Sequence, residues 1–277
     1  MKKRKLRPST LTDAKTRLTR FSNAWGEMAI DSVEAKDIDD LMDEYGYVGA
    51  NRDNYVRRLE AFYNWAIKET RTKSNPVLQT DEIALNWEMP RICKPTEAQS
   101  IIWKAEEIQP KLVPYLAIAF FAGVRPEEIS RLKWPDIDLS SGEIHIRGEQ
   151  SKTRHARLVP ISDNLKAWLI KYRNTSSEDK RILPASPAAL AKWRTKVMTA
   201  AKVEMIQDGA RHSFATYFYA LHGISDTMNA LGHSNPQMLK KHYEALMKNR
   251  KAQAKKYFEI EPNAKTKVIP LQRTGTE

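Results

Sequence analysis

The chain has 277 residues, of which 46 are Lys or Arg and 34 are Asp or Glu, so its formal net charge is +12. This length allows one large or two ordinary domains, and the 41% of hydrophobic residues excludes wholesale disorder. The single cysteine, Cys93, excludes an intramolecular disulfide and a cysteine-based zinc cage. The longest apolar stretch, from Leu112 to Val124, has 13 residues, whereas a membrane-spanning helix needs roughly 20. We therefore expect a chain of a reducing compartment, without a spanning helix or a secretory signal.

The positive charge is unevenly distributed. Residues 1–20 hold eight Lys or Arg against Asp13 alone, and we expect them to form a basic arm. Residues 21–90 hold seven Lys or Arg against fourteen Asp or Glu, and residues 91–277 hold 31 against 19. A surplus of this size indicates a polyanionic partner. An anionic membrane surface is the competing interpretation, because Lys and Arg serve both.

The first part of the chain predicts a small helical bundle. Apolar residues at helical spacing predict two helices. The shorter helix contains Ile38, Leu41 and Met42, and Gly46 ends it. The longer helix contains Tyr55, Leu59, Phe62, Ala66 and Ile67. The stretch from Thr72 to Pro95 contains three prolines and lacks helical periodicity, which favours a linker. We therefore expect a helical domain at 21–80 and a linker at 81–95. Arg52, Arg57 and Arg58 are expected to give the helical domain a local basic face.

The remaining chain predicts further helices and one hairpin. Helix starts are expected at the Thr96–Gln99 capping box, at Ser162 and at Ser186-Pro187, and Gly223 is expected to end a helix that begins near Ala210. Alternating residues at 143–147 and 156–161, separated by a polar basic turn, predict a β-hairpin. The expected fold class is mainly α with a small β-hairpin or sheet (α+β). We expect this domain at 96–260 and a C-terminal tail at 261–277.

Two segments of this domain present basic residues at turns. Gly123 can end one helix and Pro126 can begin the next, which places Arg125 in an elbow between them. On this segment alone, an arginine that binds the exposed carbonyls of a helix end is at least as good an interpretation as a catalytic one. In the hairpin turn, Lys152, Arg154 and Arg157 are expected to face outward. Taken alone, that turn is best explained as a solvated basic loop.

Two later segments hold further candidates. Arg211 lies in the first turn of a predicted helix, where a cation opposes the helix dipole, so we expect a compensating partner. A later helix is expected to begin near Pro236, with His233 just before it and Tyr243 about two turns along. Taken alone, His233 is better explained as a turn histidine and Tyr243 as a half-buried core aromatic.

Together and in this order, the four segments resemble the tyrosine recombinase or phage integrase family, over nearly the whole chain. The elbow matches the family's A-G-x-R-x-x-E motif, Lys152 fits its hairpin lysine, and Arg211 begins a match to R-H-[ST]-F-[AS]-[ST]. Asp208 stands where the family has a histidine three residues before that arginine. The last box is L-G-H-[ST], followed by a tyrosine, and residues 231–234 match it.

The resemblance implies the site residues Arg125, Lys152, Asp208, Arg211, His233 and Tyr243. Tyr243 would attack a DNA phosphate and form a 3′-phosphotyrosyl link, the arginines and His233 would bind the non-bridging oxygens, and Lys152 would protonate the leaving 5′ oxygen. Asp208 would accept the phenol proton in place of histidine. The interval from His233 to Tyr243 is one residue longer than in many members, so Tyr217 and Tyr219 remain alternative nucleophiles. No metal or nucleotide cofactor is implied.

The resemblance also implies a function and partners. It implies a site-specific recombinase or integrase from a phage, a mobile element or a bacterial chromosome, acting in the bacterial cytoplasm or that of a phage host. Its partners would be double-stranded DNA and accessory DNA-bending proteins, and the chain would form a homotetramer on two duplexes. Exchange of a C-terminal segment between protomers is a further expectation, for which residues 252–277 are long enough. Two alternatives stay open: a DNA-binding protein of the same fold with weak or lost catalysis, and a type IB topoisomerase.

Overall fold

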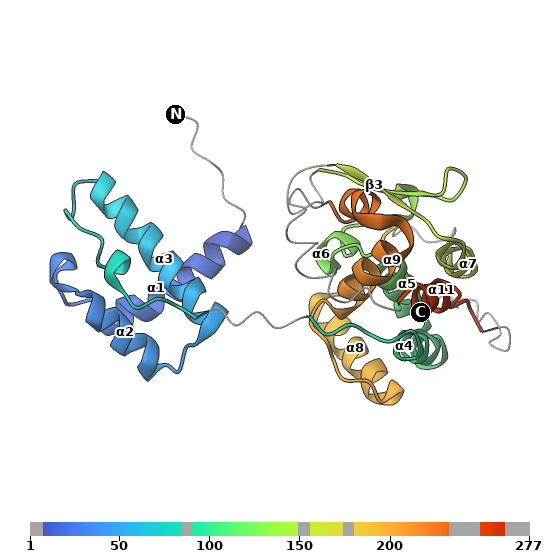
Figure 1. The fold of residues 1–277 in the computed structure, drawn as a ribbon, viewed down its shortest axis with the longest axis horizontal. Coiled ribbons are helices and arrows are strands. Elements are labelled where there is room, and N and C mark those ends of the chain that lie inside the picture. Colours follow the sequence, from blue (N-terminus) through green and yellow to red (C-terminus); the bar gives the residue numbers. More distant parts are fainter. Residues whose placement is uncertain (1–7, 85–89, 149–155, 174–179, 233–249, 264–277) are drawn as a thin grey trace, which may run out of the picture. The chain divides into compact units, whose positions relative to one another are not determined.

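The chain folds into two units (Figure 1). The computed structural model describes residues 8–84, 90–148, 156–173, 180–232 and 250–263. Unit 1 is Met1–Glu88 and unit 2 is Met89–Glu277. None of the helices in the described part of the chain is long and apolar enough to cross a membrane.

The described residues of unit 1, 8–84, form a bundle of three helices. They are α1 (Pro8–Trp25), α2 (Ala35–Glu44) and α3 (Gly49–Lys68), with short 3-10 turns at Ile30–Ser32 and Pro76–Gln79. Gly46 follows α2 with a φ of +64°, a left-handed conformation that suits glycine and confirms the predicted helix end. The core of unit 1 consists of apolar side chains from all three helices, among them Phe21, Ile38, Met42 and Leu59.

The segment expected to form a basic arm is helical from residue 8 onward. Its residues belong to α1, which packs against α3. Arg17 pairs with Asp13, with 2.8 Å between Nε and the carboxylate, and its guanidinium lies 4.6 Å from the centre of the Tyr55 ring. The described part of the arm is therefore a folded part of unit 1.

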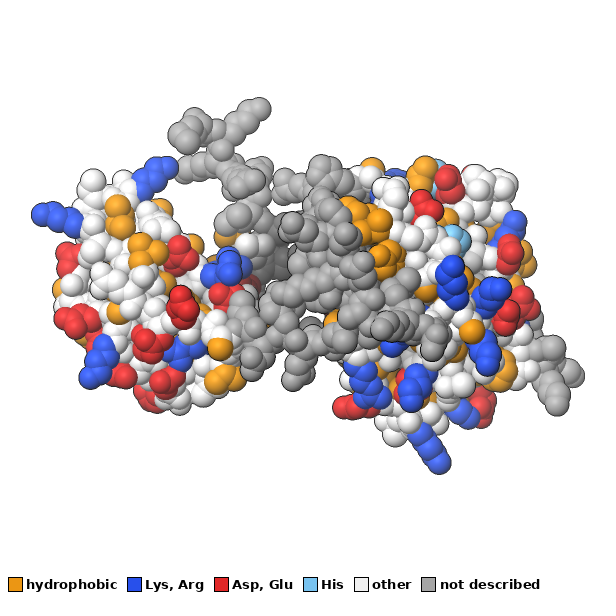
Figure 2. Space-filling model, in the orientation of Figure 1, with side chains coloured by type: hydrophobic (Ala, Val, Ile, Leu, Met, Phe, Trp, Pro, Cys, Tyr) orange, Lys and Arg blue, Asp and Glu red, His pale blue; other side chains and the backbone are white. Residues whose placement is uncertain are grey.

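The three arginines expected to form a local basic face are paired with aspartates. Arg52 contacts two aspartates of α2, Arg57 contacts an aspartate one turn earlier, and Arg58 contacts an aspartate of α1. On the face of unit 1 in Figure 2, side chains of both signs are interspersed. Each of these guanidinium groups therefore has a neutralising carboxylate beside it, which an isolated count of arginines does not reveal.

Unit 2 is mainly helical with one small sheet, as the sequence predicts. Its helices are α4 (Pro95–Ile108), α5 (Val113–Phe121), α6 (Pro126–Ile129), α7 (Asp163–Tyr172), α8 (Pro187–Ala201), α9 (Gly209–Leu231) and α11 (Arg250–Phe258). The antiparallel sheet has the order β1 (Ile137–Asp138), β2 (Glu143–Ile146), β3 (Arg157–Pro160). Strands β2 and β3 are the predicted hairpin.

Helix α5 lies at the centre of unit 2 (Figure 1). All nine of its residues are buried, and it packs against α4, α7 and α9. Two buried tyrosine hydroxyls donate to backbone carbonyls nearby: Tyr257 to Phe120, at 2.7 Å, and Tyr217 to Cys93, at 3.2 Å. The elbow that follows α5 therefore projects from the most enclosed part of the fold.

Of the predicted helix starts that lie in the described residues, all but one agree with the structure. The Ser186 hydroxyl accepts from the Ala189 N–H at 3.2 Å, as a helix cap should. The predicted Thr96–Gln99 capping box is wrong: α4 begins at Pro95, and the Lys94 N–H donates to the Glu97 carboxylate at 2.7 Å. Because proline is favoured in the first turn, the helix begins one residue before the threonine.

Helix α9 is kinked at Gly223. The φ and ψ of Gly223 are 80° and −175°, so two helical halves meet there, and the predicted end of the first half is confirmed. In a straight helix, 20 residues span about 30 Å. Arg211 and Leu231 are 20 residues apart, yet Arg211 Nη2 lies 2.8 Å from the Leu231 carbonyl oxygen. The kink therefore turns the second half of α9 back toward the first turn of the helix.

The described C-terminal residues pack on their own unit. Helix α11 contacts α9 and α4. Beyond it, the Ile260 carbonyl accepts from the Trp168 ring N–H at 2.9 Å, and the Asn263 N–H donates to Glu106 at 3.2 Å. Residues 252–263, part of the segment expected to exchange between protomers, are thus docked on unit 2 of the same chain. The rest of that segment lies outside the described residues.

Candidate active site

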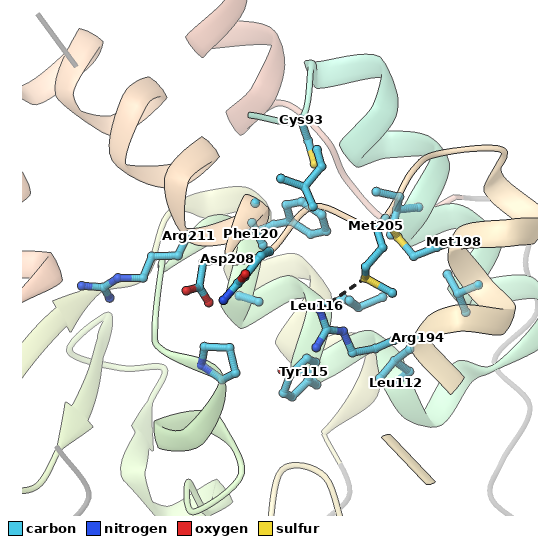
Figure 3. Close-up of a pocket in the computed structure, with 18 of the residues that line it drawn as sticks. Cys93, Leu112, Tyr115, Leu116, Phe120, Arg194, Met198, Met205, Asp208 and Arg211 are labelled. Atoms are coloured by element: carbon cyan, nitrogen blue, oxygen red, sulfur yellow. Dashed lines mark hydrogen bonds between the residues drawn. The ribbon is translucent and has the colours of Figure 1, made fainter. Parts of the chain in front are cut away.

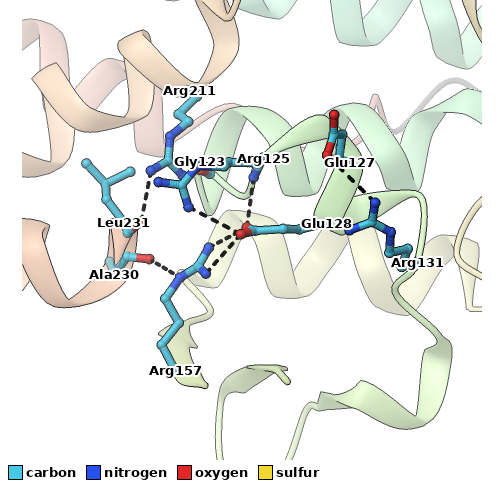
Figure 4. A network of polar contacts seen from close by, with 9 residues as sticks. All are labelled: Gly123, Arg125, Glu127, Glu128, Arg131, Arg157, Arg211, Ala230 and Leu231. Atoms are coloured by element: carbon cyan, nitrogen blue, oxygen red, sulfur yellow. Dashed lines mark hydrogen bonds and ion pairs between the residues drawn. The ribbon is translucent and has the colours of Figure 1, made fainter. Parts of the chain in front are cut away.

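The elbow after α5 places Arg125 beside Glu128. Gly123 has a φ of +60°, and Pro126 begins α6 three residues later, as predicted. Arg125 donates from its backbone N–H to Glu128 Oε2 at 3.3 Å and from Nη1 to Oε1 at 3.2 Å (Figure 4). Arg125 is therefore oriented by a carboxylate, whereas the competing interpretation required helix-end carbonyls as its partners.

Arg211 binds the helix-end carbonyls instead. Its side chain donates from Nη1 to the Gly123 carbonyl at 2.5 Å and from Nη2 to the Leu231 carbonyl at 2.8 Å. Only 9% of the residue is exposed. The Gly123 carbonyl lies just after the C-terminal end of α5, and the Leu231 carbonyl belongs to the last residue of α9. Helix dipoles place partial negative charge at such ends. This is the compensation expected for a cation in the first turn of a helix, and it brings Arg211 to the turn that carries Arg125.

Arg157 points inward, so the prediction that it faces solvent is wrong. Its side chain is 8% exposed. It donates to both oxygens of Glu128, from Nη2 at 2.6 Å and Nη1 at 3.3 Å, and from Nε to the Ala230 carbonyl at 3.0 Å (Figure 4). Strand alternation could have revealed this orientation, because Arg157 shares a face with buried Val159 while Leu158 between them is 51% exposed.

Glu128 is the residue that joins the two arginines. Its side chain is 1% exposed and accepts from both Arg125 and Arg157. Burial opposes its ionisation, but the hydrogen bond and charge of Arg157, with the charge of Arg125, outweigh that effect and hold the pKa of Glu128 below its usual value. Glu128 is therefore a buried carboxylate that stays ionised because two cations surround it. Sequence reasoning placed Glu128 in a motif but gave it no partner.

Asp208 occupies a left-handed turn at the start of α9. Its φ and ψ are 51° and 14°, a conformation that aspartate tolerates better than most residues, and its carbonyl accepts from the His212 N–H at 2.9 Å. Its side chain is exposed. Asp208 and Arg211 both border a cavity of about 150 Å³ whose apolar walls come from α4, α5 and α8. In Figure 3 the Arg211 guanidinium points away from those walls.

Of the two alternative nucleophiles, the structure excludes Tyr217. Its side chain is fully buried, its hydroxyl is bound to the Cys93 carbonyl, and burial raises its pKa to about 12. Tyr219 is half-buried on the same helix.

A Tyr217→Phe substitution tests this assignment. We expect the free energy of unfolding to fall by about 1 kcal/mol, because one buried hydrogen bond to a backbone carbonyl is lost. Urea unfolding measures this loss. Formation of a covalent protein–DNA adduct should be unchanged, and an adduct that disappears in this variant would restore Tyr217 as a candidate.

Three of the predicted site residues fall outside the described residues: Lys152, His233 and Tyr243. The same holds for Arg154 and for the helix expected near Pro236. Among the predicted residues that the structure describes, Arg125 and Arg211 meet at the Gly123 turn, and Asp208 lies one helical turn before Arg211. The structure thus brings two segments 88 residues apart to one place.

Comparisons with known proteins agree with this arrangement. Residues 88–250 match the model of the phage integrase family. The chain is 26% identical over 204 residues to the tyrosine recombinase XerC of Xanthomonas axonopodis pv. citri, which covers 68% of this chain and 66% of the relative. It is 26% identical over 194 residues to XerC of Pelotomaculum thermopropionicum, with coverage of 61% and 62%. The chain therefore spans just under two thirds of the length of these relatives.

Solved structures share the fold. A lambda integrase (residues 75–356) dimer bound to a COC′ core site superposes with a TM-score of 0.71 at 20% identity, covering 85% of this chain and 91% of that one. The Tn1549 transposon integrase in complex with circular intermediate DNA gives a TM-score of 0.67 at 18% identity, covering 87% and 91%. The elbow at Arg125 and the helix start at Arg211 both lie within the residues that the family model matches, and these residues make up more than half of the sequence. The chain belongs to the phage integrase family.

Proposed function

We propose that this chain is a site-specific DNA recombinase that cleaves and rejoins DNA through a transient 3′-phosphotyrosyl intermediate. The observation that carries the proposal is the meeting of Arg125 and Arg211 at the Gly123 turn, in a chain of this family. Two guanidinium groups at one place suit the two non-bridging oxygens of a phosphodiester. The proposed catalytic domain is 96–260, and the proposed DNA-clamping domain is 21–80.

The proposed chemistry needs a strongly cationic site. An unperturbed tyrosine has a pKa of about 10, so only about one in a thousand is ionised at pH 7. In the proposed step, the Tyr243 oxygen bonds to phosphorus, and the bond from phosphorus to the 5′ oxygen breaks. Asp208 takes the phenol proton and Lys152 supplies one to the leaving oxygen. A 5′ hydroxyl of a partner strand then attacks the phosphotyrosyl link and releases Tyr243.

The two described arginines contribute in different ways. The carbonyls of Gly123 and Leu231 accept from two different nitrogens of Arg211 and so orient its guanidinium. Arg125 shares Glu128 with Arg157, so two cations balance one carboxylate and this cluster keeps a net positive charge. A positive cluster partly withdrawn from water stabilises the negative charge of a pentacoordinate phosphorus transition state more strongly than the same charges in bulk solvent.

Partners follow from the same proposal. Double-stranded DNA is the substrate, and four copies of the chain act on two duplexes, with accessory DNA-bending proteins as further partners. A solved lambda integrase tetramer bound to a Holliday junction superposes with a TM-score of 0.73 at 19% identity, covering 87% of this chain. Because the two chains share a fold, this structure supports the proposed assembly. Lys and Arg side chains on the face of unit 2 seen in Figure 2 are consistent with a polyanionic partner. The proposed location is the bacterial or host cytoplasm.

A suicide DNA substrate tests the function. The substrate is a pool of fragments from the neighbouring genome, nicked so that the released 5′ hydroxyl diffuses away and the covalent link accumulates. We expect a covalent adduct on denaturing gels with the unmodified chain and none with Tyr243→Phe, since the nucleophilic oxygen is gone. Tyr219→Phe is the matched control and should form the adduct.

The remaining outcomes separate the alternatives. DNA binding without an adduct on any fragment would identify a DNA-binding protein that has lost catalysis. Relaxation of a supercoiled plasmid that lacks a specific site would favour a type IB topoisomerase. An adduct that survives Tyr243→Phe but is lost in Tyr219→Phe would move the nucleophile to α9.

A further inference from the structure

Arg157 connects three segments that lie far apart in the sequence. It is the first residue of β3 and follows the hairpin segment that contains Lys152. Its two Nη atoms hold the Glu128 carboxylate of the elbow, and its Nε holds the Ala230 carbonyl near the end of α9. Three donors of one planar group therefore fix the relative positions of the hairpin, the elbow and the end of α9.

The contact at the end of α9 is close. Gly232 has a φ of +63°, and a Cβ added there would lie 2.9 Å from Arg157 Cδ and 3.3 Å from its Nε. The backbone of Gly232 thus packs directly on the arginine stem, and His233 is the next residue in the sequence. The carbonyl of Leu231, between the two residues that Arg157 contacts, is an acceptor of Arg211.

We propose that Arg157 is a positioning residue for strand cleavage: it holds Glu128 against Arg125 and holds the end of α9 at a fixed distance from the elbow. This inference rests on the proposed function, because it assigns Arg157 an effect on a reaction that Arg125 and Arg211 carry out. Arg157 is buried among protein groups and acts on the substrate only through its neighbours.

The mechanism is geometric. One oxygen of Glu128 accepts from the Arg125 side chain, and the other accepts from the Arg125 backbone N–H. The carboxylate plane therefore sets the direction of the Arg125 guanidinium. Without Arg157, the Glu128 carboxylate loses its two-pronged partner and can rotate. A misplacement of about 1 Å in a catalytic group costs on the order of 100-fold in rate. The step affected is cleavage, since DNA affinity depends on many phosphate contacts across the protein.

The test measures DNA affinity and cleavage separately in the full chain. Affinity comes from titration of the unnicked fragment that forms the adduct, and cleavage from the rate of adduct formation on the nicked suicide form at saturating protein. For Arg157→Met we expect adduct formation to slow by about 10- to 100-fold, with affinity within about threefold of the unmodified chain. Lys171→Met is the matched control, because Lys171 also pairs with a carboxylate that is 1% exposed, that of Glu106, on helices away from the elbow. The control should cleave at the normal rate.

A second variant guards against unfolding. Arg157→Met leaves Glu128 buried with one cation fewer, which destabilises the fold. The double variant Arg157→Met with Glu128→Gln removes the buried charge as well, and circular dichroism should show it folded. It should still cleave slowly, because the amide cannot restore the link between the hairpin and the elbow.

The decisive readout is coupling to Arg125. The factor by which Arg157→Met slows cleavage is measured in two backgrounds, the unmodified chain and Arg125→Lys. We expect this factor to be smaller in the Arg125→Lys background, by at least about tenfold, because the group that Arg157 positions is already altered there. A merely structural role would give the same slowing in both backgrounds, and that result overturns the proposal. Normal cleavage by a folded Arg157→Met chain overturns it too, while the function stands. Absence of any adduct with the unmodified chain overturns the function and this proposal together.

Discussion

Replacing Gly123 with alanine is expected to lower the free energy of unfolding of unit 2 by about 2–5 kcal/mol. Two costs add together. The φ of +60° places an L-residue in the left-handed region, and the new Cβ would overlap the ring atoms Cδ1 and Cγ of Phe214. That ring is fully buried and stacks on Phe218 with 4.8 Å between ring centres, so it has no space into which to move. Urea unfolding followed by tryptophan fluorescence measures the loss.

Gly142→Ala is the matched control for this substitution. Gly142 also has a positive φ, of +73°, but no atom lies within 4 Å of the position that its Cβ would take. It therefore isolates the backbone cost, about 1–2 kcal/mol. If both variants lost the same stability, the contact with Phe214 would not limit the turn, and the explanation given for Gly123 would be wrong.

Replacing Arg211 with lysine is expected to reduce adduct formation by about 100- to 1,000-fold, the range seen when one donor to a developing oxyanion is removed. Lysine keeps the charge but not the planar fork, so it cannot bind the Gly123 and Leu231 carbonyls and a phosphate in one geometry. The free energy of unfolding should also fall by about 1–3 kcal/mol, because buried carbonyls lose a charged donor. Adduct kinetics and urea unfolding measure the two effects independently.

Arg194→Lys is the matched control for Arg211. Arg194 lines the same cavity, and its described partner is the sulfur of Met205, at 3.4 Å. We expect stability within about 0.5 kcal/mol of the unmodified chain and normal adduct formation. A normal cleavage rate in Arg211→Lys would show that the fork is dispensable, and Arg211 would then be a structural residue that joins two helix ends.

Local sequence signals predicted several helix boundaries and the elbow. Proline after serine at residue 187, glycine at 123 and glycine at 223 impose backbone conformations that depend little on the rest of the fold. The prediction of a capping box at Thr96 was wrong because the neighbouring Pro95, which is also a local helix-start signal, begins the helix one residue earlier. These features could be predicted because each is decided within four or five residues.

The partners of the arginines could not be predicted in the same way. Arg157 meets Glu128 across 29 residues and Ala230 across 73, and Arg211 meets Gly123 across 88. Such pairs depend on how the hairpin, the elbow and α9 pack together, which no local pattern encodes. Strand alternation predicts that the Arg157 side chain points inward, but its position beside a basic turn favoured the interpretation that it faces solvent. Family resemblance assigned roles to Arg125 and Arg211 without revealing what orients them.

The kink at Gly223 makes residues 211–231 a loop that the hydrogen bond from Arg211 Nη2 to the Leu231 carbonyl closes. Whatever draws the Arg211 guanidinium toward a new partner must therefore act on Leu231, and thermodynamic linkage requires the reverse effect to be equally large. A phosphate that binds Arg211 and strengthens its hydrogen bond to the Leu231 carbonyl would stabilise the end of α9. A partner that stabilises the same hydrogen bond would, to the same degree, tighten phosphate binding. Assembly and substrate affinity would then be two measurements of one coupling free energy.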